Sequence, residues 1–343
     1  AEIPVDDGSV ITVVCGDESW PTMNDNSSEK QTYTITVSFP SPWQRINGTD
    51  RYETMSKIVE ESFDSCDTAV VASGENFPDA LSASALAGQL DCPVVITETS
   101  TLSDSAKSTL ESLGVSNVVI VGGKAAVSES AESAIEDMGI TASRVSGKTR
   151  QDTSLAVMDE VLNSSQPDTV IVATGKNFAD ALSIAPLAYA KGFPVVLTEN
   201  DGTLTSAEVE AIQETGAENA IIVGGSAAVS SSVDSQLSDM TVTRINGKDR
   251  YATSSEIANY EVENCGMDYS KVAIASGENF PDALTGAAMC GYNNSVLILA
   301  NDTTDSGITE VVNNGSSIST GYVLGGSAAV SEDVFDYLDT NAK

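Results

Sequence analysis

The chain has 343 residues, of which 41% are hydrophobic and 5% aromatic, enough for two or three domains with cores of their own. Its 50 acidic and 16 basic residues give a formal net charge of -34, and a field of that sign repels nucleic acids and anionic membranes. The lack of histidine excludes Ser-His-Asp and Cys-His nucleophile systems and the usual histidine-containing zinc sites. No stretch approaches the ~20 apolar residues of a membrane helix.

Residues 1–42 resemble no other part of the chain. Within them, Val10–Val14 and Tyr33–Phe39 alternate like two strands on either side of the polar loop Gly16–Lys30. This pattern predicts an antiparallel hairpin packed on the rest, or the end of an upstream β-domain. Because the chain begins at Ala1 with no basic and apolar leader, we expect a mature chain or an excised fragment.

The remainder is a threefold repeat with a period near 100 residues. All six arginines stand at the ends of the pattern Arg-x-x-Gly-x-x-Arg, which occurs at 45–51, 144–150 and 244–250. Ser-Gly-Glu-Asn-Phe-Pro-Asp-Ala-Leu at 73–81 returns in similar form at 174–182 and 276–284, and Val-Gly-Gly-Lys-Ala-Ala-Val-Ser at 121–128 returns at 223–230 and 324–331. A copy of this length is a domain, so we place domains at 43–141, 142–241 and 242–343.

Within the first copy, helices and strands alternate. The predicted elements are a helix over 53–63, a strand over 68–72, a helix over 78–90, a strand over 93–97, a helix over 103–113, a strand over 117–121 and a helix over 128–139. Pro78 suits a first helical turn, Ser103 is a typical N-cap and Gly114 a typical end. The strands are continuous apolar runs, which indicates a parallel sheet covered on both faces. Each copy is therefore predicted to be a small Rossmann-like α/β module.

Short strands at the first arginine of each motif predict how the modules are joined. Such a strand follows copies one and two, at Arg144 and Arg244, whereas the third copy ends on a helix over 334–338 with no strand after it. If each strand completes the sheet of the copy before it, the strand at Arg45 must complete the third. We therefore expect a closed ring with pseudo-threefold symmetry and its ends close together.

The cysteines suggest two disulfides. Cys66 and Cys92 precede the first and second strands of copy one, and neighbouring parallel strands begin at the same edge of a sheet. Cys265 and Cys290 lie in comparable places in copy three. We expect the bridges Cys66–Cys92 and Cys265–Cys290, with Cys15 left over, which would place the protein outside the reducing cytosol. The alternative is that these are small buried thiols.

The loops after the strands are the candidate sites, because ligands of open α/β sheets bind beyond the carboxyl ends of the strands. Neither the loop from Gly74 to Asp79 nor Gly122-Gly123-Lys124 has the Gly-x-Gly-x-x-Gly fingerprint or a Walker lysine, which argues against a nucleotide. A glycine-rich turn before a helix can still receive an anion.

The arginines and aspartates of the motifs admit two interpretations. Asp79, Asp180 and Asp282 either favour the dipole of the helix that they begin, or pair with arginines across the junctions between copies. The second arginine of each motif can hold an anionic ligand, because guanidinium is the natural fork for phosphate or carboxylate. The first arginines, inside strands, are expected to be structural; they are Arg45, Arg144 and Arg244.

Taken together, the three motifs resemble the type 2 cell wall-binding repeat of Gram-positive surface proteins, over residues 43–343. The resemblance implies a triangular ring of Rossmann-like modules and non-covalent attachment to anionic secondary polymers of the cell wall. Carried over by position, the ligand-binding residues are Arg51, Asn76, Asp79, Arg150, Asn177, Asp180, Arg250, Asn279 and Asp282. Copy two departs from the pattern with Ala179 in place of proline, and copy three has no equivalent of Pro93.

The leading functional hypothesis is an extracellular anchor that holds a fused or partner domain on the cell wall. Its partner is an anionic wall polymer, it needs no cofactor, and it does not insert into membranes or bind nucleic acid. The alternative is an adhesin or surface-layer protein in which Ca²⁺, as a bridging cation, assists assembly. An enzyme is not expected, because no base, nucleophile or metal cluster stands out.

Overall fold

A computed structural model describes residues 2–4, 10–12 and 41–342 of the chain. They fall into two units, residues 1–40 and 41–343. In the first unit, β1 (Glu2–Pro4) pairs antiparallel with β2 (Val10–Thr12). The strand predicted at Val10 is therefore confirmed in a shorter form, and its partner β1 had not been predicted. The predicted strand over 33–39, the loop over 16–30 and Cys15 lie outside the described residues.

The first repeat has the predicted order of elements. They are α1 (Arg51–Ser62), β4 (Thr68–Ser73), the 3-10 turn η1 (Ala80–Ser82), α2 (Ala83–Gln89), β5 (Val94–Thr97), α3 (Asp104–Leu113), β6 (Asn117–Val121), α4 (Glu129–Glu136) and β7 (Thr141–Val145). The hydroxyl of Ser103 accepts a hydrogen bond from the amide of Ala106, and Gly114 ends α3 with a φ of 72°. These caps place α3 where the sequence predicts it.

The second and third repeats follow the same plan. The second contains α5 (Arg150–Leu162), β8 (Thr169–Thr174), α6 (Ala179–Ser183), α7 (Ala185–Lys191), β9 (Val195–Thr198), α8 (Ser206–Glu214), β10 (Asn219–Val223), α9 (Ser232–Gln236) and β11 (Thr241–Ile245). The third contains α10 (Arg250–Cys265), β12 (Asp268–Ser276), α11 (Pro281–Tyr292), β13 (Ser295–Ala300), α12 (Ser306–Asn313), the 3-10 turn η2 (Gly315–Ser317), β14 (Gly321–Leu324) and α13 (Glu332–Asn341).

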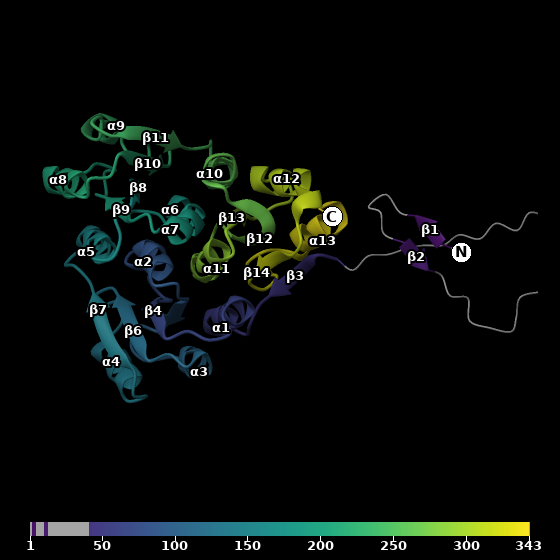
Figure 1. The fold of residues 1–343 in the computed structure, drawn as a ribbon, viewed down its shortest axis with the longest axis horizontal. Coiled ribbons are helices and arrows are strands. Elements are labelled where there is room, and N and C mark those ends of the chain that lie inside the picture. Colours follow the sequence, from purple (N-terminus) through teal and green to yellow (C-terminus); the bar gives the residue numbers. More distant parts are fainter. Residues whose placement is uncertain (1, 5–9, 13–40, 343) are drawn as a thin grey trace, which may run out of the picture. The chain divides into compact units, whose positions relative to one another are not determined.

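Each repeat contains one four-stranded parallel sheet, and the third sheet closes the ring. The strand orders are β5-β4-β6-β7, β9-β8-β10-β11 and β13-β12-β14-β3. The strand β3 (Trp43–Ile46), which precedes the first repeat, pairs in parallel with β14 of the third. The indole N–H of Trp43 donates to the carbonyl of Ala342 over 2.9 Å, so the two ends of the ring meet. The predicted closure is confirmed (Figure 1).

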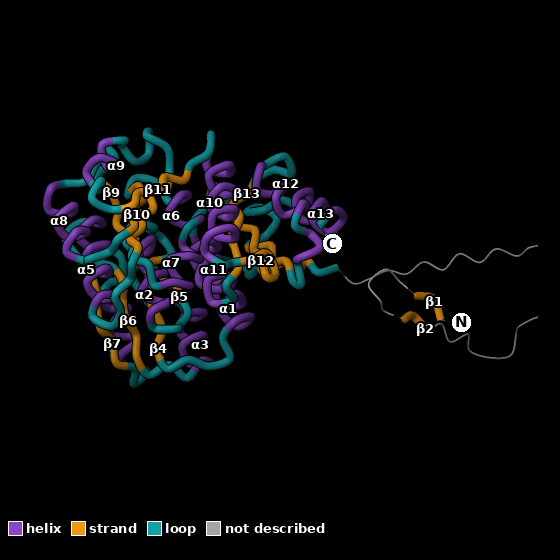
Figure 2. Tube along the Cα trace, turned by 45° about the horizontal axis from the view of Figure 1, so that its top comes forward, coloured by secondary structure: helices purple, strands orange, loops and turns teal. Residues whose placement is uncertain are grey.

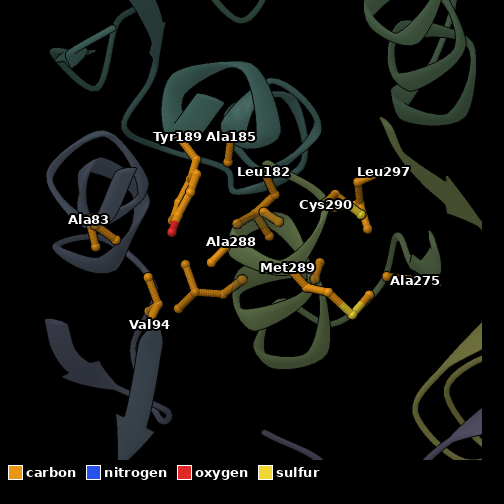
Figure 3. Packing of buried hydrophobic residues seen from close by; sticks show 14 of the residues in the cluster. Ala83, Val94, Leu182, Ala185, Tyr189, Ala275, Ala288, Met289, Cys290 and Leu297 are labelled. Atoms are coloured by element: carbon orange, nitrogen blue, oxygen red, sulfur yellow. The ribbon is translucent and has the colours of Figure 1, made fainter. Parts of the chain in front are cut away.

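Helices α2, α7 and α11 pack against one another at the centre of the ring (Figure 1, and in a tilted view Figure 2). Figure 3 shows Tyr189 of α7 lying between Ala83 of α2 and Ala288 of α11. The Tyr189 hydroxyl donates to the carbonyl of Cys92 over 3.2 Å. A Cβ on Gly88 would lie 1.9 Å from the Tyr189 carbonyl oxygen, so only glycine allows this close approach of α2 and α7.

The predicted disulfides are wrong, because Cys66, Cys92, Cys265 and Cys290 are free thiols. The Cys66 thiol donates to the carbonyl of Thr68 over 2.9 Å, and Cys92 is buried in the core. Cys265 lines a cavity between α10 and the second module, whereas Cys290 of α11 lies in the core of the third. Strand order brings the chain segments to one edge of the sheet, but it does not orient their side chains.

One buried carboxyl group lies between the second and third modules. Glu261 of α10 is fully buried, and neither carboxyl oxygen has a hydrogen-bond partner. Burial raises the pKa of Glu261 well above its ordinary value; the nearby backbone of Leu187 in α7 opposes the rise but does not reach normal hydrogen-bond geometry with the carboxyl group. The equivalent positions of the other copies carry Ser62 and Val161. Neither of those side chains carries a charge into the core.

Replacing Glu261 by valine, the residue of copy two, is expected to stabilise the fold at pH 8 by about 1–3 kcal/mol, because it removes an unsatisfied buried polar group. Since the folded-state pKa is raised, the advantage is smallest below the ordinary pKa and grows as pH rises through the folded value. Urea unfolding at pH 5 and pH 8 measures it. Equal stability of the two proteins at both pH values would contradict the burial argument.

Candidate functional site

The first arginine of each motif holds a module together, as predicted. Arg244 donates to the carbonyls of Gly224 and Val229 over 2.7 and 3.0 Å, and it also pairs with the carboxylate of Asp234. Arg45 and Arg144 make the same kind of contacts, with the carbonyls of Gly325 and Gly122 as acceptors and the carboxylates of Glu332 and Glu132 as partners. These guanidinium groups are largely buried, and each is held by at least one backbone carbonyl and one carboxylate. They are therefore structural.

The second arginine of each motif is the first residue of a helix and remains accessible. Arg51 donates to the carbonyl of Gly74 over 2.5 Å, and Arg150 and Arg250 donate to the carbonyls of Gly175 and Gly277. Arg51 is exposed and the other two are partly exposed. One hydrogen bond fixes each guanidinium at the carboxyl end of a strand and leaves its other donors available.

The glycine inside each arginine motif allows this placement. A Cβ on Gly147 would lie 2.2 Å from the Cβ of Asp152, so the loop can lie against the first turn of α5 only without a side chain. The amide of Gly147 donates to the Thr153 hydroxyl over 3.0 Å. The other copies repeat this bond, from Gly48 to Thr54 and from Gly247 to Thr253.

Each motif aspartate lies opposite the arginine of the next module. Burial raises the pKa of Asp79, and the Thr153 hydroxyl and the Arg150 guanidinium oppose the rise. Burial likewise raises the pKa of Asp180 against Arg250, and that of Asp282 to about 6 against Arg51. Asp282 and Arg51 face each other across the junction at which β3 pairs with β14 and closes the ring. Within residues 41–342, none of these pairs approaches within the 4.0 Å of an ion pair.

The predicted site residues therefore meet across the junctions and not within one copy. We call the three places junction sites; they are one–two (Asn76, Asp79, Arg150), two–three (Asn177, Asp180, Arg250) and three–one (Asn279, Asp282, Arg51). At junction site one–two, a cavity of about 360 Å³ is lined by Asn76, Asp79 and Arg150 together with Gly123 and Lys148. The asparagine of every site is exposed. Each site thus offers a cation, an amide and a half-buried carboxyl group.

Glycines make room for the aspartates. Gly122 has a φ of 116°, and a Cβ there would lie 2.9 Å from the Oδ2 atom of Asp79. Gly224 and Gly325 have the same relation to Asp180 and Asp282. The left-handed backbone favours glycine, and the space above it is filled by the carboxyl group. This explains the first glycine of the Val-Gly-Gly motif.

Three phenylalanines at the centre of the same face were not predicted as part of the site. The ring centroids of Phe77, Phe178 and Phe280 lie 5.6, 5.9 and 6.3 Å apart. The guanidinium of Arg150 lies 5.9 Å from the Phe77 centroid, and that of Arg250 lies 5.8 Å from the Phe178 centroid. The repeated phenylalanine of the motif was the available signal. The triad fixes the three junction sites around one centre.

Comparison with known proteins gives a consistent result. The family model of cell wall binding domain 2 (CWB2) matches residues 45–132, 144–234 and 244–335. The chain is 30% identical over 296 residues to N-acetylmuramoyl-L-alanine amidase LytC of Bacillus subtilis strain 168, covering 86% of this chain and 58% of that protein. It is 28% identical over 304 residues to the amidase enhancer of the same strain, covering 88% of this chain and 41% of that protein.

Solved structures share the fold. Cwp6 from Clostridium difficile superposes with a TM-score of 0.80 at 23% identity, over 93% of this chain and 50% of Cwp6. Cwp8 from Clostridium difficile gives 0.77 at 22% identity, over 88% of this chain and 52% of Cwp8. The chain thus spans about half the length of these relatives. None of the helices in its described part is long and apolar enough to cross a membrane. With three tandem matches over most of its length, the chain belongs to the cell wall binding domain 2 (CWB2) family.

Proposed function

We propose that the chain anchors a surface protein non-covalently to the bacterial cell wall by binding an anionic wall polymer at the three junction sites. The observation that carries this is the state of Arg51, Arg150 and Arg250. Each is fixed by a glycine carbonyl at a strand end, and within residues 41–342 none forms an ion pair with the aspartate across its junction; Arg250 alone has another carboxylate in range, that of the exposed Glu278 at 3.8 Å. A guanidinium with free donors at a cavity suits a phosphate or carboxylate of the polymer.

Membership of the CWB2 family supports the wall as the target. The ring adds a reason for three sites, because a repetitive polymer can contact several of them at once. Weak contacts at linked sites combine, and avidity can exceed single-site affinity by ~10² to 10⁴. The aspartates reduce the net positive charge of each site and provide acceptors for hydroxyl groups of a glycan.

We further infer that this chain binds the wall and does not modify it, and that it needs no cofactor. The sequence has no histidine to serve as a base. Within residues 41–342, no group of three or more Cys, Asp or Glu side chains is placed to hold a metal ion. Assembly assisted by Ca²⁺ stays an alternative, and self-association measured with Ca²⁺ and with EDTA tests it.

Co-sedimentation with purified Gram-positive cell walls tests the proposal. The chain is expected to pellet with intact walls and to remain in solution with walls whose anionic polymers have been extracted by acid. The extracted polymer fraction should compete with intact walls. Equal pelleting with intact and extracted walls would show that the target is not an anionic polymer.

Wall binding is expected to strengthen as pH falls from 7 to 5. The Asp282 pKa is raised to about 6, so this carboxyl group is mostly ionised at pH 7 and mostly neutral at pH 5. Its negative charge opposes a bound anion, and one such charge about 5 Å away alters the affinity of junction site three–one roughly fourfold in water. Binding curves of Asp282→Asn should depend less on pH than those of the unmodified chain, and the affinity at pH 7 should move toward the pH 5 value. An unchanged pH profile in that variant would contradict the role of Asp282.

A further inference from the structure

The three junction sites have different charges, although their arginines and aspartates are equivalent. We propose that junction site one–two is the principal anion site and that Lys176 makes it so. This inference rests on the proposed function and ranks its sites. It predicts that the polymer is held mainly between the first and second modules.

The residue after the glycine that holds each arginine changes from copy to copy. It is Glu75 in the first, Lys176 in the second and Glu278 in the third, and all three are exposed. The carboxylate of Glu278 lies 3.8 Å from the Nη1 atom of Arg250, which shows that this position faces the guanidinium. Lys176 occupies the equivalent position in copy two, directly after Gly175, whose carbonyl accepts from Arg150. There it adds a second positive charge where copies one and three have a negative one.

The residue after each arginine changes together with this position. In copy three the Tyr251 hydroxyl donates to the Glu278 carboxylate over 2.7 Å, which holds the acid beside Arg250. Copy one has the same types, Tyr52 and Glu75. In copy two the tyrosine is replaced by Gln151, a buried residue whose Nε2 atom donates to the Thr198 carbonyl over 2.9 Å. Copy two therefore has neither the acid nor the phenol that anchors it.

A second position follows the same trend. Lys148 lines the cavity of junction site one–two, and Lys248 is its equivalent at site two–three. Site three–one has the uncharged Thr49 there. With the helix N-cap residues Thr149, Asp249 and Asp50 included, the charged groups are three cations and one carboxylate at site one–two, two cations and three carboxylates at site two–three, and one cation and three carboxylates at site three–one. Nearby Lys124 and Glu129 pair with each other and leave this order unchanged.

Charge differences of this size matter for an anion that is held at a surface. Two unit charges about 5 Å apart interact with roughly 0.8 kcal/mol in water, and salt reduces this beyond about 8 Å. A change from Lys to Glu alters the local charge by two. The expected change in affinity for a bound anion is about tenfold.

Binding curves for purified Gram-positive cell walls at low salt test the ranking. Lys176→Glu is expected to weaken binding about tenfold, and Glu278→Lys to strengthen it. Lys191→Glu is the matched control, with the same change of net charge. Lys191 is exposed and is the last residue of α7, shortly before β9 begins. It therefore lies near the edge of the sheet opposite the junction sites, which are at the carboxyl ends of the strands. The Lys191→Glu variant should bind walls like the unmodified chain.

Single replacements separate the inference from the proposed function. Arg150→Ala should weaken wall binding about tenfold or more, and Arg51→Ala and Arg250→Ala clearly less. Equal losses in all three variants, or equal effects of Lys176→Glu and Lys191→Glu, would overturn the ranking and leave the arginine sites in place. No loss in any single variant or in the combined one would overturn the proposed function itself.

Discussion

Replacing Arg51, Arg150 and Arg250 together by alanine is expected to abolish binding to cell walls and to leave the ring folded. Each guanidinium would otherwise form charge-assisted hydrogen bonds with the polymer, worth about 1.5–3 kcal/mol apiece. Losing all three removes the avidity of the ring as well, so the affinity should fall by ~10² or more. Co-sedimentation with intact walls measures the loss.

The fold should survive because these arginines contribute little to it. Each donates one hydrogen bond to a backbone carbonyl, Arg150 and Arg250 also lie over the rings of Phe77 and Phe178, and only Arg250 also has an ion pair, at 3.8 Å, within residues 41–342. Such contacts contribute about 1 kcal/mol or less apiece. Circular dichroism and urea unfolding check that the alanine variant is folded and stable.

A triple arginine-to-lysine variant keeps the three charges without the two-pronged guanidinium geometry and should retain part of the binding. Unchanged pelleting of the alanine variant, with the fold intact, would end the proposal.

Replacing Trp43 by alanine is expected to lower the free energy of unfolding by about 3–5 kcal/mol, the range for a large aromatic residue in a core. Trp43 is 5% exposed, and its indole N–H donates to the Ala342 carbonyl. A Cβ on Gly321 would lie 2.4 Å from the indole, so the ring fills the space that this glycine leaves. The substitution removes the side chain that closes the ring between β3 and β14.

Urea unfolding followed by circular dichroism measures the effect of Trp43→Ala. Gln44→Ala is the matched control, because Gln44 is exposed on the same strand and its replacement should change stability by less than about 0.5 kcal/mol. A loss below about 1 kcal/mol in Trp43→Ala would contradict the importance of the closure.

The sequence predicted the modules and the closure because both follow from strand and helix patterns. The placing of Arg45 with the third copy came from counting strands, and β3 pairs with β14 as that count requires. The boundaries of α3 and β6 came from Ser103, Gly114 and a β-branched run. These features are local, so a single sequence contains them.

Features that depend on relations between side chains could not be predicted. The disulfides failed because the position of a residue at a sheet edge does not say where its thiol points. Glu261 lies in α10, and nothing along the chain shows that the second module covers it. The sequence left open whether the motif aspartates favour the dipole of their own helix or pair with arginines across the junctions, and Asp79 faces Arg150 of the next copy. Only the arrangement of the modules decides between these two interpretations.

The most direct test of the anchoring account is to observe the six arginine side chains while the acid-extracted wall polymer is added. The Nε–Hε signals of uniformly ¹⁵N-labelled protein report each arginine, and single arginine-to-lysine variants assign them. The account predicts that the signals of Arg51, Arg150 and Arg250 shift as the polymer binds and that those of the strand arginines Arg45, Arg144 and Arg244 do not. Saturable binding of the polymer with no shift of the first three signals would contradict it.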